Sequence, residues 1–259
     1  MPSVTYISDI HLEFYKASMP FESILQWKKG DILCLAGDIG YPELPSYQAF
    51  LTYASSLFTH VFIIAGNHEY YQTRDCPHKT IHSVNNHITD ICAQFPNVHF
   101  LNNTTYYMPE FDTYVLGTTL WSTTTGDHDE LYTYNDFKKI HNMALPEYMD
   151  RLHDMSVSYV TGELEKLNMA SSNSKIIVLT HHMPSYKLIH PSYKGSDINH
   201  LFATNLEKLM YTYRIDHWIC GHSHTSMNIT IHNTQLWMNP VGYPGEHQHV
   251  TWDTSFLIL

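Results

Sequence analysis

The chain of 259 residues is long enough for one α/β domain, and its 43% hydrophobic and 14% aromatic residues exclude wholesale disorder. Its formal net charge of −11, with only three arginines (Arg74, Arg151 and Arg214), argues against the clustered basic surface of a dedicated nucleic-acid binder. The 20 histidines are the unusual feature of the composition.

The N-terminal residues run directly into a strand-like segment, without the basic and apolar regions of a signal peptide. No apolar run approaches the roughly 18–20 residues of a membrane helix, so we expect no membrane association. The four cysteines form no C-x-x-C motif, and Cys34 and Cys220 lie inside apolar runs. We therefore predict a reduced, cytoplasmic protein without structural disulfides, and the sequence leaves its oligomeric state open.

Short apolar runs with strand character alternate with longer stretches whose apolar residues recur at helical spacing. The predicted strands are Val4–Ser8, Ile32–Ala36, Val61–Ala65, Val98–Leu101, Tyr114–Thr118, Lys175–Thr180, His217–Cys220, Asn228–Ile231, Gln235–Met238 and a last one within Val250–Leu259. The predicted helices are Phe21–Lys28, Tyr47–Phe58, Thr80–Gln94, Glu147–Leu167 and Leu201–Tyr211. This order predicts parallel strand–helix–strand units early in the chain and antiparallel pairing in the helix-poor last third.

The sequence contains no internal repeat, charge block or low-complexity linker, so we predict one layered domain over residues 1–259. Two stretches lack strand or helix periodicity, Ser122–Met143 and Met183–His200, and both are rich in Tyr, Ser, Asp and His. Long irregular segments of a compact domain are usually functional loops. We expect lid or substrate loops near 122–143 and 183–200.

Polar residues able to bind metal follow five of the predicted strands, at the point where each strand ends. These clusters are Ser8-Asp9-Ile10-His11, Gly37-Asp38, Gly66-Asn67-His68-Glu69, His181-His182 and Gly221-His222-Ser223-His224. In open α/β sheets, ligands bind beyond the carboxyl ends of the strands. The five clusters are therefore expected to converge on one site.

Most of these motifs are weak when taken singly. A lone histidine at a strand end is more often a polar cap on the core, and Asp38 or Asn67 alone could be turn residues. A second His-x-His, His247-Gln-His249, lies in a Gly/Pro-rich turn and is interpreted as surface. Gly-Asn-His followed by an acid is expected by chance only about five times in a thousand such chains, and it directly follows a strand here.

The order of the five clusters resembles the pattern of the calcineurin-like metallophosphoesterases. The resemblance spans Asp9 to His224, and nearly the whole chain if the turn Asn239–Glu246 is included. It implies an α/β fold, a four-layer α/β/β/α sandwich of two mixed sheets flanked by helices. It also implies two divalent or trivalent metal ions at the strand ends, drawn from Mn, Fe, Zn, Ni and Co.

The family pattern also implies a role for each matched residue. One ion would be held by Asp9, His11, Asp38 and His224, and the other by Asp38, Asn67, His181 and His222, with Asp38 bridging. His68 would be the catalytic histidine that binds no metal. Either imidazole of the His181-His182 doublet could be the ligand, and we favour His181 because it directly follows the strand. His182 would then either support the ligands from behind or donate to the substrate phosphate, and Asn67 and His68 are further candidate contacts to that phosphate.

Elementary chemistry agrees with a metal site of this composition. A bridging carboxylate lowers the repulsion between two cations, and the absence of clustered cysteines excludes a thiolate site. Two such ions clamp the attacking and leaving oxygens of an in-line displacement, with a bridging hydroxide as the nucleophile. His68 would protonate the leaving alkoxide as the general acid.

The sequence departs from the family pattern at one position. Some members carry an aspartate three residues after the Gly-Asp aspartate, where it orients the catalytic histidine, and this chain has Tyr41 there. Glu69 adjoins His68, but neighbouring side chains usually diverge, so we do not assign it that role. What orients His68 is left open.

The main prediction is a phosphodiesterase or phosphomonoesterase acting on small or accessible phosphorylated substrates. Lys187 and Lys194 could contact substrate, although ordinary exposed lysines are the simpler interpretation. A nuclease of the same superfamily is one alternative, which the three arginines disfavour. A catalytically silent protein-binding scaffold is the other, but such a scaffold would be expected to lose ligands that this chain retains.

Overall fold

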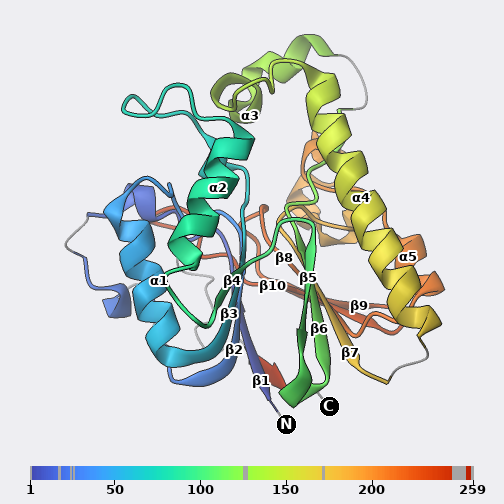
Figure 1. The fold of residues 1–259 in the computed structure, drawn as a ribbon. Helices are drawn as coiled ribbons and strands as arrows, with labels where there is room; N and C mark the ends of the chain where they lie inside the picture. The colour runs from blue at the N-terminus through green and yellow to red at the C-terminus, as the bar shows by residue number, and fades with distance from the viewer. Residues whose placement is uncertain are drawn as a thin grey trace.

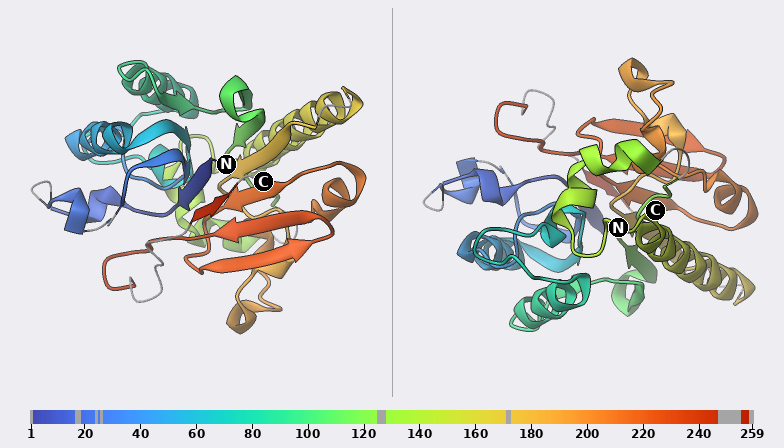
Figure 2. Two further views of the ribbon diagram at one scale, coloured as in Figure 1. Left: turned by 90° about the horizontal axis from the view of Figure 1, so that it is seen from below. Right: turned by 90° about the horizontal axis from the view of Figure 1, so that it is seen from above.

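The computed structural model describes residues 2–16, 19–23, 25, 27–124, 128–170, 173–246 and 255–257. Two β-sheets pack face to face and helices cover the outer face of each, which gives four α/β/β/α layers (Figure 1). Seen from either end of the strands, α1 and α2 lie on one outer side and α4 and α5 on the other (Figure 2). The predicted fold class is confirmed.

The first sheet has five strands in the order β11-β1-β2-β3-β4. Strands β1 to β4 are parallel, and β11 pairs antiparallel with β1. Their bounds are β1 Ser3–Ile7, β2 Gly30–Ala36, β3 Phe58–Ile64, β4 Val98–Phe100 and β11 Ser255–Leu257. The sheet is mixed because of β11 alone.

The second sheet has six strands in the order β5-β6-β7-β8-β10-β9. The four central strands are parallel, and the edge strands β5 and β9 are antiparallel to their neighbours. Their bounds are β5 Thr104–Met108, β6 Thr113–Thr118, β7 Lys175–Thr180, β8 His217–Cys220, β9 Met227–Ile231 and β10 Thr234–Met238. The antiparallel pairing expected for the last third is confirmed for the hairpin of β9 and β10 and for β11, which pairs with β1, but β10 runs parallel to β8.

The outer helices begin where the local sequence favours a helix start. Helices α1 (Pro45–Leu57) and α4 (Pro146–Met169) each open with proline, whose fixed φ suits the first helical turn. Helix α2 (Ile81–Cys92) is preceded by a capping box between Thr80 and Ser83. Helix α5 (Glu207–Thr212) is short and packs on the second sheet beside α4 (Figure 1).

Alternate residues of each central strand face different layers of the core. In β2, Leu33 and Leu35 pack with the helix layer formed by α1 and α2. Cys34 and Ala36 point the other way, into the layer between the two sheets, together with Ile177 of β7. A third apolar cluster fills the space between the second sheet and α4. Both faces of both sheets are therefore buried, which fixes the strand ends relative to one another.

The two stretches without strand or helix periodicity form short helical turns. The first contains η5 (His128–Thr133) and α3 (Asn135–Lys139), and the second contains η6 (Tyr186–Leu188), η7 (Pro191–Tyr193) and η8 (Asn199–Leu201). Seen from above, the segment with η5 and α3 crosses over the ends of the strands (Figure 2). The remaining short turns are η1 (Leu12–Phe14), η2 (Phe21–Ser23), η3 (His68–Tyr70) and η4 (Pro109–Phe111).

Three element predictions need correction. Among the described residues of the predicted helix Phe21–Lys28, only Phe21–Ser23 are helical, as the short turn η2. The predicted helix Leu201–Tyr211 is broken, because η8 ends at Leu201 and α5 begins at Glu207. Strand β5 was not predicted, because its Thr and Tyr residues carry no apolar run.

Within the described part of the chain, no helix is both long and apolar enough to cross a bilayer. The four cysteines are free thiols, as predicted, and three of them are buried. The motif His247-Gln-His249 lies outside the described residues.

Candidate metal centre and active site

The turns that follow the strands are tied together by their backbones at the end of the two sheets. The N–H of Asp9 donates to Gly37 O at 3.0 Å, and that of His11 donates to Asp38 O at 3.0 Å. Across the two sheets, Gly242 N donates to Asp9 O at 2.9 Å. The five clusters predicted from sequence therefore converge, and backbone hydrogen bonds hold them in place.

Two glycines permit this close approach. Gly37 has φ of +84°, and a β-carbon there would meet the backbone N of Gly66 at 2.6 Å. A β-carbon on Gly66 would collide with the Asp38 carboxylate. Only glycine fits where these two turns cross.

Left-handed backbone conformations are concentrated at the candidate ligands. Among the seven residues, φ is positive at Asp9, His11, Asp38, His222 and His224, with values from 46° to 75°. Non-glycine residues rarely adopt this region, and such strain persists only where the surrounding structure imposes it. The backbone at these positions is shaped by where the side chains must point.

The side chains form three overlapping groups, in each of which the ligand atoms lie within 4.8 Å of one another. Two of them are Asp9, His11 and His224, and Asp38, His181 and His222. The third joins these two and consists of Asp38, His11 and His68. Asp38 Oδ2 lies 3.9 Å from His11 Nε2 and 3.5 Å from His181 Nε2. Asp38 thus occupies the position between the two groups that was predicted for a bridging carboxylate.

Three of the imidazoles have their outer nitrogen occupied by a hydrogen-bond acceptor. His11 Nδ1 lies 3.2 Å from Glu13 Oε1, His181 Nδ1 lies 2.8 Å from Ala36 O, and His224 Nδ1 lies 2.9 Å from Glu246 Oε2. Each bond requires a proton on Nδ1, so Nε2 is the nitrogen available to a metal ion. The Nε2 atoms of His11 and His224 point toward each other and are 3.0 Å apart. This is the arrangement of metal-binding histidines, and the donor set fits borderline cations such as Zn, Mn or Fe.

Asn67 is oriented by its amide nitrogen. Its Nδ2 donates to Asp136 Oδ1 at 2.8 Å and to Tyr71 Oη at 3.1 Å. These bonds turn Oδ1 toward His181, whose Nε2 is 3.0 Å away. The amide therefore presents a neutral oxygen to the group that contains Asp38 and His181.

The electrostatics of the cluster favour positive charge. Burial opposes ionisation of Asp38, but the imidazoles of His181 and His68 outweigh it and hold the pKa of this carboxyl well below its usual range. Burial likewise opposes protonation of His181, but the Asp38 carboxylate raises the pKa of His181 to about 10. The buried carboxylates thus create a potential that a cation would satisfy.

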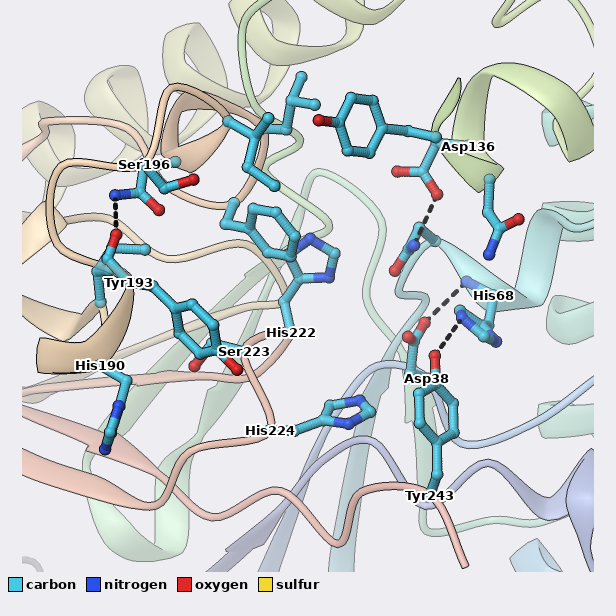
Figure 3. Close-up of a pocket in the computed structure, with 18 of the residues that line it drawn as sticks. Asp38, His68, Asp136, His190, Tyr193, Ser196, His222, Ser223, His224 and Tyr243 are labelled. Carbon is cyan, nitrogen blue, oxygen red and sulfur yellow. Dashed lines mark hydrogen bonds between the residues drawn. The ribbon is translucent and has the colours of Figure 1, made fainter. Parts of the chain in front are cut away.

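His68 lies at the edge of the cluster and faces the cavity. Its Nδ1 is 3.0 Å from Glu13 Oε1, and its Nε2 is 3.4 Å from Tyr243 Oη (Figure 3). Burial lowers the pKa of His68, but the Asp38 carboxylate and the Glu13 hydrogen bond outweigh burial, so its pKa is raised. Glu13 therefore occupies the orienting position for which the sequence offered no candidate.

Tyr41 has a different environment. The ammonium of Lys79 lies 4.9 Å from the centroid of its ring, and burial raises the pKa of its hydroxyl to about 12. Glu69, the other acid near His68 in sequence, is fully buried and accepts the backbone N–H groups of Asp38, Ile39 and Gly66 at 2.8–3.1 Å. It holds two strand-end turns together, in keeping with the decision not to assign it to His68.

The histidine doublet is divided between two environments. His181 lies in the cluster, whereas His182 is fully buried with its ring stacked on His222 at a centroid distance of 4.2 Å. His182 Nδ1 pairs with Ser122 Oγ at 2.7 Å, and His182 does not line the cavity. The structure therefore places His182 behind His222, and its predicted contact with substrate phosphate has no counterpart among these contacts.

A cavity of about 420 Å³ opens over the cluster (Figure 3). Its floor includes Asp38, Asn67, His68, His222 and His224. Its walls come from the two irregular segments and from the turn that carries Tyr243 and Glu246. Such a volume is typical of small-molecule sites.

Four residues of this site were not predicted from sequence. Glu13 and Glu246 each accept from a ring nitrogen of a candidate ligand, and Asp136 orients Asn67. The ring of Tyr243 packs at a tilt against that of His11, with 4.6 Å between their centroids. The spacing Asp9-x-His11-x-Glu13 was a usable signal, because an acid so close to a ligand histidine can reach its other nitrogen. Asp136 carried no signal, since it lies 69 residues from its partner in an irregular segment.

Comparisons with known proteins agree on the family and the fold. A protein of Acanthamoeba polyphaga mimivirus, uncharacterized protein L509, is 28% identical over 272 residues, covering 96% of this chain and 94% of its own length. The phosphopantetheinyl hydrolase PptH of Mycobacterium tuberculosis superposes with a TM-score of 0.73 at 16% identity, over 95% of this chain and 91% of its own. A dimetal phosphatase from Danio rerio gives a TM-score of 0.58 at 14% identity, over 96% and 91%.

The two structural matches show a common fold, and the sequence match to the family carries the assignment. The family model described as calcineurin-like phosphoesterase matches residues 2–226, which include every candidate ligand. The chain belongs to the calcineurin-like phosphoesterase family, whose general chemistry is the metal-dependent hydrolysis of phosphoesters.

Proposed function

We propose that this protein is a binuclear metal-dependent hydrolase of small or accessible phosphoesters, a phosphodiesterase or phosphomonoesterase. The observation that carries the proposal is the set of three imidazoles, those of His11, His181 and His224, whose Nδ1 atoms are occupied by acceptors. This leaves their Nε2 atoms facing the cluster around Asp38. A purely structural histidine cluster has no need of such orientation.

Seven residues would hold the ions. Asp9, His11, Asp38 and His224 would hold one, and Asp38, Asn67, His181 and His222 would hold the other. When bound, such ions polarise phosphoryl oxygens and lower the pKa of a water molecule to near neutrality. The chain contributes the fixed orientation of each ligand and the glycine-lined crossing of two turns beneath Asp38.

His68 would act as the general acid. Glu13 accepts from its Nδ1, so the proton available for a leaving group is on Nε2, which faces the cavity beside Tyr243. The Glu13 carboxylate that accepts from Nδ1 stabilises the protonated ring, which is the form a general acid requires. Orientation by a carboxylate and protonation on the cavity side together suit transfer of a proton to an alkoxide.

The irregular segments 122–143 and 183–200 would serve as substrate loops of a single metallophosphoesterase domain. Both contribute side chains to the cavity, including Asp136 from the first and Tyr193 from the second. Lys187 of the second segment instead pairs with Glu207 at 2.6 Å and does not line the cavity.

A cytoplasmic location is proposed from the cysteine pattern of the sequence, and cell fractionation tests it.

The nuclease alternative is less well supported. Among the described residues that line the cavity, none is Lys or Arg, so the phosphates of a polymer flanking the scissile one would meet no cationic side chain there. The scaffold alternative predicts lost ligands, and all seven candidate positions keep a residue able to bind metal. Both observations favour hydrolysis of small phosphoesters.

The experiment combines metal analysis with an assay panel. Purified protein supplemented with Mn, Fe, Ni or Zn is analysed for bound ions and assayed on p-nitrophenyl phosphate, bis-p-nitrophenyl phosphate and cyclic nucleotides. We expect two ions per chain and hydrolysis of at least one ester class. Asp38→Ala should lose both properties, and Asp90→Ala, an exposed acid on α2, is the matched control. Protein that binds no ion after supplementation and hydrolyses no ester would contradict the proposal.

A further inference from the structure

The walls of the cavity differ in chemistry from its floor. The floor carries the histidines and carboxylates of the candidate metal centre, whereas the walls are largely aromatic and apolar. Tyr134 and Phe137 come from the first irregular segment, and Ile189, Tyr193 and Phe202 come from the second segment and the residues after it. In Figure 3, Tyr193 and Ser196 lie across the cavity from Asp38 and His68. A substrate whose phosphate sits on the floor would place its organic group between these walls.

Apart from His68, which the proposed function assigns to the leaving group, the described part of the cavity offers no cation for a second negative group. None of the lining residues is Lys or Arg. His190 lines the cavity, but its Nδ1 accepts the N–H of Ser192 at 3.2 Å, which a doubly protonated ring could not do. Of the lysines close to the lining residues, Lys138 donates to Thr133 O, and Lys187 pairs with Glu207. The ammonium of Lys139 lies 5.1 Å from the ring centroid of Tyr71 and is not itself a lining group.

The acids that line the cavity further disfavour a substrate with a second negative group. Glu246 accepts from His224 Nδ1 and from the N–H of Tyr243, and Asp136 accepts from Tyr71 and Asn67. Both carboxylates face the same cavity and neither offers a hydrogen to an anion. A second phosphate or a carboxylate on the substrate would be desolvated beside them without a partner, which is costly.

The neutral polar groups in the walls complete the pattern. Asn135, Ser196 and Asn199 line the cavity and can form hydrogen bonds with an uncharged group. Aromatic walls with a few neutral polar groups are typical of sites for flat, uncharged organic moieties.

We infer that this cavity selects phosphoesters whose group beyond the single reacting phosphate is uncharged, flat and largely apolar, and that it rejects substrates with a further anionic group. The inference rests on the proposed function for the position of the phosphate. According to this inference, the walls formed by the two irregular segments select the organic group of the substrate.

Binding of phosphinates tests the inference without hydrolysis, because their P–C bonds are not cleaved. Dimethylphosphinate, methyl(phenyl)phosphinate and (4-carboxyphenyl)methylphosphinate carry the same ionised phosphinate and differ only in the side group. Their affinities for the metal-supplemented protein are measured by calorimetry. The phenyl compound should bind at least about tenfold more tightly than the dimethyl compound, because its ring is removed from water. The carboxyphenyl compound should bind at least about tenfold more weakly than the phenyl compound, because its added carboxylate finds no partner.

Two substitutions locate the effect in the walls. Asn135→Lys supplies the missing cation and should improve binding of the carboxyphenyl compound about fivefold, without improving that of the phenyl compound. Asn86→Lys, on the exposed surface of α2, adds the same charge away from the cavity and should change neither. Tyr193→Ala should lower the preference for phenyl over methyl at least about threefold. Tyr211→Ala removes an equally exposed tyrosine of α5 and should leave that preference unchanged.

The outcomes separate this inference from the proposed function. Equal affinities for the three phosphinates, or tightest binding of the carboxyphenyl compound, would overturn the inference even if methyl p-nitrophenyl phosphate is hydrolysed. Failure to bind ions and to hydrolyse any monoester or diester of the panel, the methyl and phenyl p-nitrophenyl phosphates included, would overturn the proposed function. The phosphinate affinities would then still show which side group the cavity prefers. Phenyl selectivity that Asn135→Lys and Tyr193→Ala alter as described supports the inference.

Discussion

Glu13 is the side chain whose removal tests the site most sharply. Its side chain is 3% exposed, and its Oε1 accepts from both His11 Nδ1 and His68 Nδ1, at 3.2 and 3.0 Å. One carboxylate therefore orients a candidate metal ligand and the candidate acid. Glu13→Gln keeps the shape of the side chain but removes its charge, and its amide cannot accept from two N–H donors as well as the carboxylate does.

The size of the effect follows from these two bonds. A hydrogen bond to a charged group contributes about 1.5–3 kcal/mol, which corresponds to about 10- to 100-fold in an equilibrium or rate constant. We expect Glu13→Gln to weaken the affinity for one ion by a factor in that range, through His11. With saturating metal, kcat/KM on an alkyl phosphoester should fall by a similar factor, because His68 loses its orienting partner.

The assay compares an alkyl ester with a p-nitrophenyl ester at saturating metal and measures metal affinity separately. Because p-nitrophenolate leaves without a proton, Glu13→Gln should affect that ester less. In a His68→Asn background, Glu13→Gln should cause no further loss on the alkyl ester. Glu110→Gln is the matched control, since Glu110 accepts from His60 at 2.6 Å outside the site. A Glu13→Gln enzyme with unchanged metal affinity and unchanged alkyl-ester kcat/KM would refute the assignment.

The remaining predictions concern four other side chains. Asp38→Ala should abolish binding of both ions and activity, whereas Asp38→Asn should retain more metal, as measured by metal analysis. His68→Ala should keep both ions and lose about 10²–10⁴-fold in kcat/KM on an alkyl ester but much less on a p-nitrophenyl ester; equal losses would mean that His68 is not the acid. Glu69→Ala leaves three buried backbone donors without an acceptor and should lower the free energy of unfolding by about 2–4 kcal/mol in urea titrations. Burial and His60 lower the pKa of His99 from 6.5 to about 4, so its unfolded form binds a proton first as the pH falls. Stability should therefore decline from pH 6.5 toward 4, and His99→Phe should reduce that decline in urea midpoints.

The layers of the fold were predictable because a strand that is buried on both faces is continuously apolar in sequence. Strand β2 is continuously apolar from Ile32 to Ala36, as expected for a parallel strand covered on each side. The edge strand β5, Thr104–Met108, is largely exposed or half-buried and carries Thr and Tyr in place of aliphatic residues. Edge strands of this kind resemble loops in sequence, so β5 could not be found from periodicity.

The candidate ligands were predictable because they follow apolar strands, whereas the acids that hydrogen-bond to them were not predictable. Each ligand follows an apolar run, so topology alone brings Asp9, Asp38 and His181 to one edge of the sheets. Glu246 and Asp136 reach the site from segments with no periodic pattern, and only the folded chain shows which acid pairs with which ligand. The left-handed backbone at the ligands is likewise imposed by tertiary structure, since nothing in the local sequence demands it.

His68 has a carboxylate partner, Glu13, although position 41 carries tyrosine. The short turn η1 begins at Leu12, directly after His11, and it carries the Glu13 side chain back beneath both His11 and His68. Glu13 joins the candidate acid to a candidate metal ligand through one oxygen. Loss of metal affinity and loss of general-acid catalysis should therefore appear together when Glu13 is changed. Separate acids for the two histidines would allow each property to be lost alone, so the joint loss distinguishes the two arrangements.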